Sequence, residues 1–170
     1  MVGVVIRDAR PEDADPLSRL LNSIVDEGDK TAIEQHLSPE AFTEWFIAGE
    51  HCLGCVVATE SEQFLGFQAV EGYHDDLPPG WVDVATFVSE PARGKGIGML
   101  LMDTTLRNCL ERHLQVLRAV VRRSNEGAVD YYRRLGFSEL PPADHSPPSP
   151  SIVMVRHTTP ARTSAALTDR

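Results

Sequence analysis

Short runs of apolar residues, some alternating with polar ones, recur along this 170-residue chain, and stretches with helical spacing lie between them. The periodicity predicts strands at residues 2–10, 52–60, 64–73, 81–89, 114–123 and 151–157. It predicts helices at residues 11–28, 38–49, 97–114 and 125–137. The helix at 97–114 is apolar over a wide arc, so we expect it to be well buried. The first helix is expected to bury one face, made of Leu17, Leu20, Leu21 and Ile24.

The order of these elements predicts an α/β fold of the α+β type. Residues 61–63 form a short connection typical of a hairpin, so the early strands are expected to be antiparallel. A later strand–helix–strand unit implies a parallel crossover between the fourth and fifth strands. We therefore predict a mixed, mostly antiparallel twisted sheet of about six or seven strands, flanked by about four helices. Residues 1–157 are predicted to form a single domain, and residues 158–170 a flexible C-terminal tail.

Composition narrows the class of protein. Hydrophobic residues make up 42% and charged residues 24% of the chain, as in ordinary soluble proteins. No stretch approaches the roughly 20 apolar residues needed to cross a bilayer, and the N-terminus does not resemble a signal peptide. We therefore expect a cytoplasmic enzyme without a membrane partner. The net charge of −9 argues against nucleic acid as a partner, because a polyanion requires a basic face.

The three cysteines give no sign of a metal or redox site. Cys52 and Cys55 have C-x-x-C spacing, but they lie in a predicted strand, where positions three apart face opposite ways. Cys109 is isolated, and no second Cys/His pair offers zinc-like spacing. We interpret all three as structural thiols of a reducing compartment, and we predict no metal.

The sequence EPARGKGIG at residues 90–98 places three glycines between a strand and a helix. The start of a helix presents unpaired N–H groups, and glycines let an anion approach them closely, so this turn predicts phosphate binding. Two nucleotide signatures do not fit. Lys95 precedes Gly96 instead of the Ser or Thr of a P-loop, and the glycine spacing is not that of a dinucleotide turn.

Arg93, Gly96 and Gly98 form an R-x-x-G-x-G pattern that strongly resembles the coenzyme A motif of the GNAT superfamily of N-acetyltransferases. A second block, NEGAVDYYRRLGF at 125–137, is similar to that family's N-x-x-A-x-x-[FY]-Y-x-x-x-G-F segment. The resemblance implies a GNAT fold, acetyl-CoA as donor and a small amine as acceptor, and it allows a homodimer, since dimers are common in the family. The implied coenzyme A residues are Phe87, Val88, Arg93, Gly94, Lys95, Gly96, Ile97, Gly98, Asn125, Tyr131 and Tyr132.

The resemblance also implies roles in catalysis. Tyr132 matches the family tyrosine placed near the sulfur as a proton donor, whereas its neighbour Tyr131 is expected mainly to pack. The backbone near Phe87 and Val88 is expected to bind the carbonyl oxygen and the pantetheine arm. Asp83 and Glu71 are the candidate general bases, ahead of a third candidate, His74.

Three functions follow from these residues. The first is an N-acetyltransferase that moves an acetyl group to a primary amine of a small molecule, with donor and acceptor bound together. Within the superfamily the chain looks most like uncharacterised bacterial and phosphinothricin or amino-acid acetyltransferase-like members. The second is a protein acetyltransferase acting on an N-terminus or a lysine. The third is a non-catalytic coenzyme A-binding module.

Overall fold

The computed structural model describes residues 3–72, 77–144 and 146–159, and its centre is a seven-stranded sheet of order β1-β2-β3-β4-β5-β7-β6. The strands are β1 (Val5–Asp8), β2 (Cys52–Glu60), β3 (Gln63–Glu71), β4 (Trp81–Val88), β5 (Val116–Arg122), β6 (Ser138–Leu140) and β7 (Ser151–His157). Every neighbouring pair is antiparallel except β4 and β5, which are parallel. The predicted mixed, mostly antiparallel sheet with one parallel crossover is confirmed.

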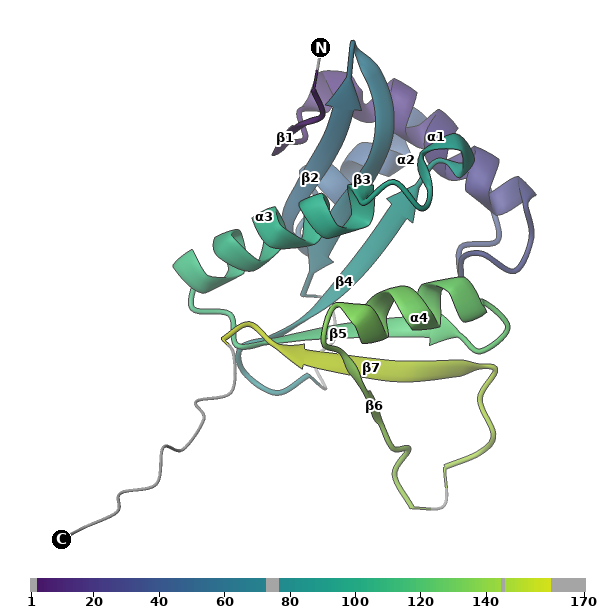
Figure 1. The fold of residues 1–170 in the computed structure, drawn as a ribbon, viewed down its shortest axis with the longest axis vertical. Coiled ribbons are helices and arrows are strands. Elements are labelled where there is room, and N and C mark those ends of the chain that lie inside the picture. The colour runs from purple at the N-terminus through teal and green to yellow at the C-terminus, as the bar shows by residue number, and fades with distance from the viewer. Residues whose placement is uncertain (1–2, 73–76, 145, 160–170) are drawn as a thin grey trace, which may run out of the picture.

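Helices cover both faces of the sheet. The helices α3 (Ile97–Glu111) and α4 (Glu126–Arg134) lie on the face toward the viewer in Figure 1, and α1 (Ala14–Asp26) and α2 (Pro39–Phe42) lie behind the sheet. Short 3₁₀ turns at Pro11–Asp13 and Glu90–Ala92 precede α1 and α3, and a π turn at Thr43–Ile47 follows α2. None of the helices in the described residues is long and apolar enough to span a bilayer.

Each face of the sheet carries its own hydrophobic core. Behind the sheet, Phe42 and Phe87 pack against the ring of Phe67, with ring centroids 5.1 Å and 4.8 Å away respectively. The four residues predicted for the buried face of the first helix all belong to this core: Leu17, Leu20, Leu21 and Ile24. On the other face, Met102 of α3 packs with residues of β5 and β7. The sheet is therefore fixed from both sides around β3 and β4.

Local sequence sets where α2 begins and where its π turn ends. Ser38 caps α2 by accepting a hydrogen bond from the Ala41 N–H, and Pro39 occupies the first helical position. The chain leaves this turn just before Gly49, which lies so close to the Glu44 carbonyl that a Cβ would be 1.6 Å from its oxygen. A glycine is therefore required there on packing grounds.

Two expectations differ from the structure. The strand β6 at 138–140 was not predicted, because it has only three residues and all are exposed, so it shows no buried alternation. The expectation that the helix at 97–114 is well buried is wrong at Met99, Leu100 and Leu110, whose exposed fractions are 55%, 41% and 42%.

Most of the predicted tail and one candidate base, His74, lie outside the described residues. Of the tail at 158–170, Thr158 is buried and its hydroxyl donates to the Leu114 carbonyl at 2.8 Å. Residues 160–170 lie outside the described residues, and so does His74.

Candidate active site

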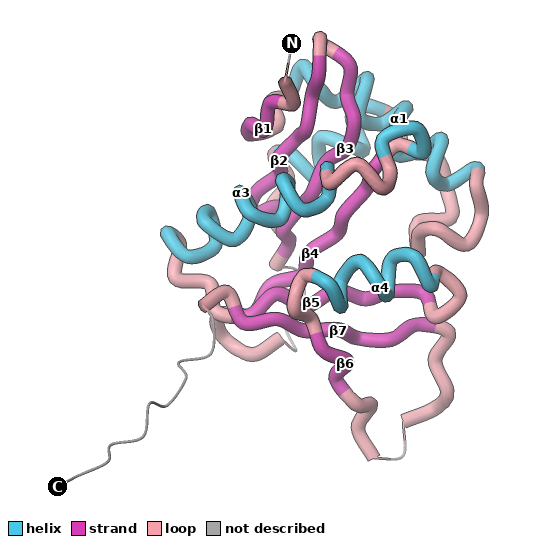
Figure 2. Tube along the Cα trace, viewed as in Figure 1, coloured by secondary structure: helices cyan, strands magenta, loops and turns pink. Residues whose placement is uncertain are grey.

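The central strands part in the middle of the sheet. The pairing of β4 with β5 ends at Asp83 and Arg118, whereas β4 remains paired with β3 as far as Val88. Figure 1 shows the two strands diverging from this point, and Figure 2 shows α3 and α4 on either side of the opening. Backbone groups of β4 beyond Asp83 therefore have no partner strand on the side toward β5, where a ligand can pair with them.

A cavity of about 540 Å³ occupies this opening. It is lined by the end of β4, the glycine turn and one side of α4. The cavity therefore lies between the two sequence blocks that resemble the GNAT motifs, at residues 90–98 and 125–137. The predicted coenzyme A residues that line it are Phe87, Val88, Arg93, Gly94, Gly96, Ile97, Gly98, Asn125, Tyr131 and Tyr132. The exposed side chain of Lys95 is not part of its wall.

The glycine turn supplies a row of unpaired backbone donors. The amides of residues 94–98 donate to no acceptor in the part of the chain that the structure describes. Gly94 and Gly96 have φ angles of +73° and +81°, and a Cβ at either position would meet no atom within 4 Å. Five successive amides beside open space at a helix start are a cradle for a phosphate or pyrophosphate group.

The Arg93 side chain is held by α1. Its guanidinium donates to both Glu27 oxygens, at 2.6 Å and 2.7 Å, and its Nε donates to the Val88 carbonyl at 3.1 Å. The hydrogen bond from Arg93 holds the pKa of Glu27 below its usual range. The charge expected beside a phosphate is therefore shared with a carboxylate, and the same pair fastens the end of α1 to the glycine turn.

Asn125 connects the other side of the opening to the same loop. Its Oδ1 accepts a hydrogen bond from the Ala128 N–H at 3.2 Å, so it caps α4. Its Nδ2 donates to the Lys30 carbonyl at 3.0 Å. The loop that follows α1 therefore touches both walls of the cavity.

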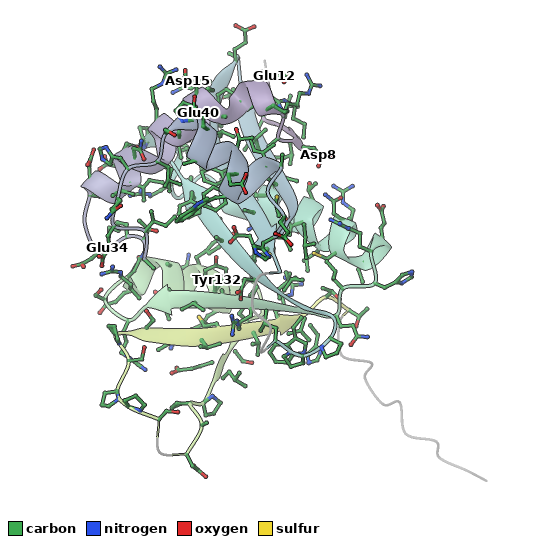
Figure 3. The ribbon with its side chains drawn as sticks, turned by 180° about the vertical axis from the view of Figure 1, so that it is seen from behind. Asp8, Glu12, Asp15, Glu34, Glu40 and Tyr132 are labelled. Carbon is green, nitrogen blue, oxygen red and sulfur yellow. The ribbon has the colours of Figure 1, made fainter. Side chains whose placement is uncertain are left out.

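Two neighbouring tyrosines face the opening from α4. Tyr132 is 5% exposed, and its Oη lies 3.0 Å from Thr86 Oγ1. Burial raises the pKa of Tyr132 to about 12, so the phenol keeps its proton at neutral pH. Tyr131 donates a hydrogen bond to the Gly98 carbonyl at 2.9 Å, and its ring packs against that glycine. Figure 3 shows Tyr132 in the interior of the molecule.

A second, smaller cavity of about 200 Å³ adjoins the first. Both cavities are lined by Lys30, Thr86, Phe87, Asn125, Ala128 and Tyr132. The smaller one also contacts Trp45 and Glu71, the latter only 6% exposed. A carboxylate thus lies at the wall of a compartment that reaches the same tyrosine.

The other candidate base, Asp83, is engaged differently. Its two oxygens accept from the Arg118 guanidinium at 2.6 Å and 2.9 Å, and it does not line the smaller cavity. In the strand register, Glu71 of β3 lies opposite Asp83 of β4, and Asp83 lies opposite Arg118 of β5. The three residues therefore form a row across these strands. The guanidinium offsets the charge of neighbouring carboxylates.

Sequence reasoning missed several residues of this site. The sequence predicts Thr86 and Gln68 only as strand residues. It places Glu27 at the end of a helix and Lys30 outside the predicted elements. A polar residue in an otherwise apolar strand was the available signal for Thr86 and Gln68. Glu27 and Lys30 reach the cavity through tertiary contacts more than 60 residues away in the chain, which periodicity does not report.

The described residues contain no group of three or more His, Cys, Asp or Glu side chains that could hold a metal ion. The cysteines at 52, 55 and 109 are free thiols. Burial raises the pKa of Cys55 and of Cys109, so neither is a ready thiolate. The side chains that line the two cavities include the Tyr132 phenol and the buried Glu71 carboxylate.

An amide cradle for phosphate, a strand edge open to a ligand, and a phenol that lines the same cavity as a carboxylate suit an enzyme that transfers a group from a phosphate-bearing donor. The family model described as "Acetyltransferase (GNAT) family" matches residues 19–137, which is more than half of the chain. The chain therefore belongs to the GNAT acetyltransferase family. The recognition made from the two sequence blocks is confirmed.

Individual relatives are more distant. The chain is 27% identical over 144 residues to phosphinothricin N-acetyltransferase of Streptomyces coelicolor, covering 81% of this chain and 83% of the relative. It is 28% identical over 140 residues to L-methionine sulfoximine/L-methionine sulfone acetyltransferase of Pseudomonas paraeruginosa, covering 78% of each. A solved phosphinothricin acetyltransferase of Sinorhizobium meliloti in complex with acetyl-CoA superposes with a TM-score of 0.77 at 20% identity, covering 91% of this chain and 88% of that one. The superposition supports the GNAT fold.

Proposed function

We propose that the protein transfers the acetyl group of acetyl-CoA to a primary amine of a small molecule, with both substrates bound together. The observation that carries the proposal is that the phosphate cradle and the two cavities adjoin one another. The unpaired amides of residues 94–98 open onto a cavity that runs to Tyr132 and meets a second cavity with Glu71 in its wall. One compartment fits the donor and the other fits the acceptor.

The donor compartment matches the parts of acetyl-CoA in order. The glycine turn binds the pyrophosphate through its amides, with the positive end of α3 adding to the attraction. The backbone of Thr86 and the N–H of Val88 face the side toward β5, where β4 and β5 part, and pair with the amides of the pantetheine arm. A backbone N–H of the same segment stabilises the thioester oxygen as negative charge develops on it.

The reaction needs one base and one acid. Glu71 accepts a proton from the ammonium group of the acceptor, directly or through water. The neutral amine then forms a bond to the thioester carbonyl carbon, the carbon–sulfur bond breaks, and the sulfur takes the proton of Tyr132 Oη. The nitrogen of the new amide loses its second proton, through water, to the Tyr132 phenolate, which restores the phenol, and Glu71 releases its proton to solvent. The ammonium and acetyl-CoA thus give the amide, the thiol of coenzyme A and one proton.

Glu71 is favoured over Asp83 as base because it lines the acceptor cavity, whereas Asp83 is bound to Arg118. Asp83 then acts by holding Arg118 in the row beside Glu71. Glu71→Gln should therefore lower kcat by about 100-fold or more and remove the acidic limb of its pH profile. An equal effect of Asp83→Asn on the pH profile would assign the base to Asp83 instead.

The small acceptor is supported by the size of the second cavity and by the relatives. A volume of about 200 Å³ suits a molecule of amino-acid size better than a protein segment. Two curated relatives are named for acetylating phosphinothricin and methionine sulfoximine or sulfone. An amine of amino-acid size is therefore the first class to screen.

Thermal unfolding with coenzyme A, acetyl-CoA, NAD and ATP tests the donor. A ligand at a hundredfold excess over its Kd should stabilise the protein by about 2.7 kcal/mol, which is a shift of several degrees. Gly96→Glu places a carboxylate in the cradle and should abolish the shift. Gly28→Glu is the matched control, because Gly28 also has a positive φ (+69°) but lies outside the cavity.

Acetyl transfer is then measured as thiol release from acetyl-CoA with a panel of amino acids, polyamines and peptides. The proposal expects turnover with a small amine and a loss of about 100-fold or more in Tyr132→Phe. No shift with either coenzyme would refute the proposal. Turnover confined to peptides would replace the small acceptor with a protein.

A further inference from the structure

A chain of polar side chains runs behind Tyr132, between the sheet and α4. Gln68 of β3 lies opposite Thr86 of β4 in the strand register, and its Nε2 donates to Thr86 Oγ1 at 2.8 Å. Thr86 Oγ1 in turn lies 3.0 Å from Tyr132 Oη. Gln68 is fully buried, so this chain is part of the interior of the protein.

A branch of the same network reaches the glycine turn. Gln68 Nε2 lies 3.5 Å from the Tyr131 hydroxyl, which donates to the Gly98 carbonyl. The amide nitrogen of Gln68 thus contacts both Thr86 and Tyr131, and the network links the sheet with both helices that line the donor cavity. A substitution of Gln68 or Thr86 therefore acts on Tyr132 without replacing a residue of the phosphate cradle.

The donor and acceptor properties of these groups fix a direction. An amide nitrogen only donates, so Thr86 Oγ1 accepts from Gln68. The single proton of Thr86 then needs an acceptor, and Tyr132 Oη lies within hydrogen-bond distance of it, at 3.0 Å. Thr86 therefore donates to Tyr132 Oη, and the phenolic proton is left to point toward the cavity.

The orientation of the Gln68 amide has a cost that fits a functional role. Its Oε1 is buried and has no hydrogen-bond partner. The reverse orientation would place the carbonyl toward Thr86, so that Thr86 would donate to Gln68 and accept from Tyr132. Buried unsatisfied polar atoms are uncommon, and they are often found where a site imposes an arrangement.

We propose that Gln68 and Thr86 are positioning residues that direct the Tyr132 proton into the donor cavity. The inference rests on the proposed function, because it assigns the network to the protonation of the leaving thiolate. Thr86 occupies the accepting side of the phenol oxygen, and Gln68 keeps Thr86 in the donating orientation. The phenolic O–H of Tyr132 then points toward the leaving sulfur when the carbon–sulfur bond breaks.

Nuclear magnetic resonance of protein labelled at tyrosine Cζ tests the direction without any activity. A phenol that accepts a hydrogen bond has its Cζ signal displaced in the opposite sense from one that donates. Thr86→Val keeps the shape of the side chain and removes the hydroxyl. We expect the Tyr132 Cζ signal to move downfield in Thr86→Val and to return in Thr86→Ser. An upfield movement would overturn the inference, because it would mean that Tyr132 donates to Thr86.

Kinetics with the best amine of the panel tests the consequence. Thr86→Val should lower kcat by about tenfold with the KM for acetyl-CoA nearly unchanged, and Thr86→Ser should restore most of it. In a Tyr132→Phe background, Thr86→Val should have no further effect. Equal losses in both backgrounds, or no rescue by serine, would reduce Thr86 to a packing role and overturn the inference.

The two proposals fail in different ways. Absence of turnover with every amine would defeat the proposed function, while the resonance experiment would still decide the direction of the hydrogen bond. Normal turnover in wild type with full activity in Thr86→Val would defeat the network alone. Gln68→Met should reproduce the kinetic loss of Thr86→Val, since it removes the donor and keeps the length of the side chain.

Discussion

The glycines at positions 94, 96 and 98 of the turn are required for different reasons, and Gly98→Ala tests the difference. Gly94 and Gly96 have positive φ angles and open space at the Cβ position. Gly98 has no positive φ, yet a Cβ there would lie 2.5 Å from Tyr131 Cε2 and 3.0 Å from its Cζ and its hydroxyl oxygen. Gly98 is therefore needed by a side chain of α4, not by the backbone conformation.

The magnitude follows from that contact. The Tyr131 ring must retreat by roughly 1 Å to reach an ordinary van der Waals distance, and overpacking of this kind costs about 1–3 kcal/mol. The hydrogen bond from Tyr131 to the Gly98 carbonyl is lost as the ring moves, which adds about 1 kcal/mol. We expect Gly98→Ala to lower the free energy of unfolding by about 2–4 kcal/mol.

Urea denaturation of a double-mutant cycle measures the effect. In a Tyr131→Ala background the obstacle is absent, so Gly98→Ala should be nearly neutral, and the coupling energy should be about 2–4 kcal/mol. Gly96→Ala is the control, because its cost comes from φ and should be the same in both backgrounds. A coupling energy near zero for Gly98 and Tyr131 would refute the packing argument.

Three further changes test other contacts. Asp13→Asn should lower the free energy of unfolding, measured in urea, by about 2–4 kcal/mol, since the 5%-exposed Asp13 carboxylate binds Arg7. The hydrogen bond from Arg7 lowers the pKa of Asp13, so this contribution is present near neutral pH and is lost as the pH falls below the usual range of Asp. Ionisation of the buried Tyr132 on unfolding should contribute about 2–3 kcal/mol of the stability that wild type loses between pH 10 and about pH 12, and Tyr132→Phe should lose that much less over the same range. Glu27→Gln should tighten coenzyme A binding in low salt by releasing the Arg93 charge, and titration calorimetry at high salt should show the difference disappear.

The parts that could be predicted from the sequence are those with a local signal. Alternation and helical spacing gave the strands and helices, and the paired motifs gave the family and the residues that line the donor cavity. The face of α3 was misjudged because periodicity cannot show that Met99 lies at the mouth of a cavity instead of in a core. The pairing of Arg93 with Glu27 joins residues 66 positions apart, and no local pattern encodes it. The row from Glu71 to Arg118 depends on strand register in the same way.

The contacts of the loop after α1 bear on how the two substrates are bound. Glu27 holds Arg93 beside the phosphate cradle, and the Lys30 carbonyl holds Asn125 at the start of α4. Lys30 itself lines both cavities, so the wall of the acceptor compartment is fastened to each side of the donor compartment. A donor that fixes the glycine turn and α4 must therefore also fix this wall. Binding free energies coupled in this way are reciprocal, so acetyl-CoA should raise the affinity for the amine by the same factor as the amine raises that for acetyl-CoA.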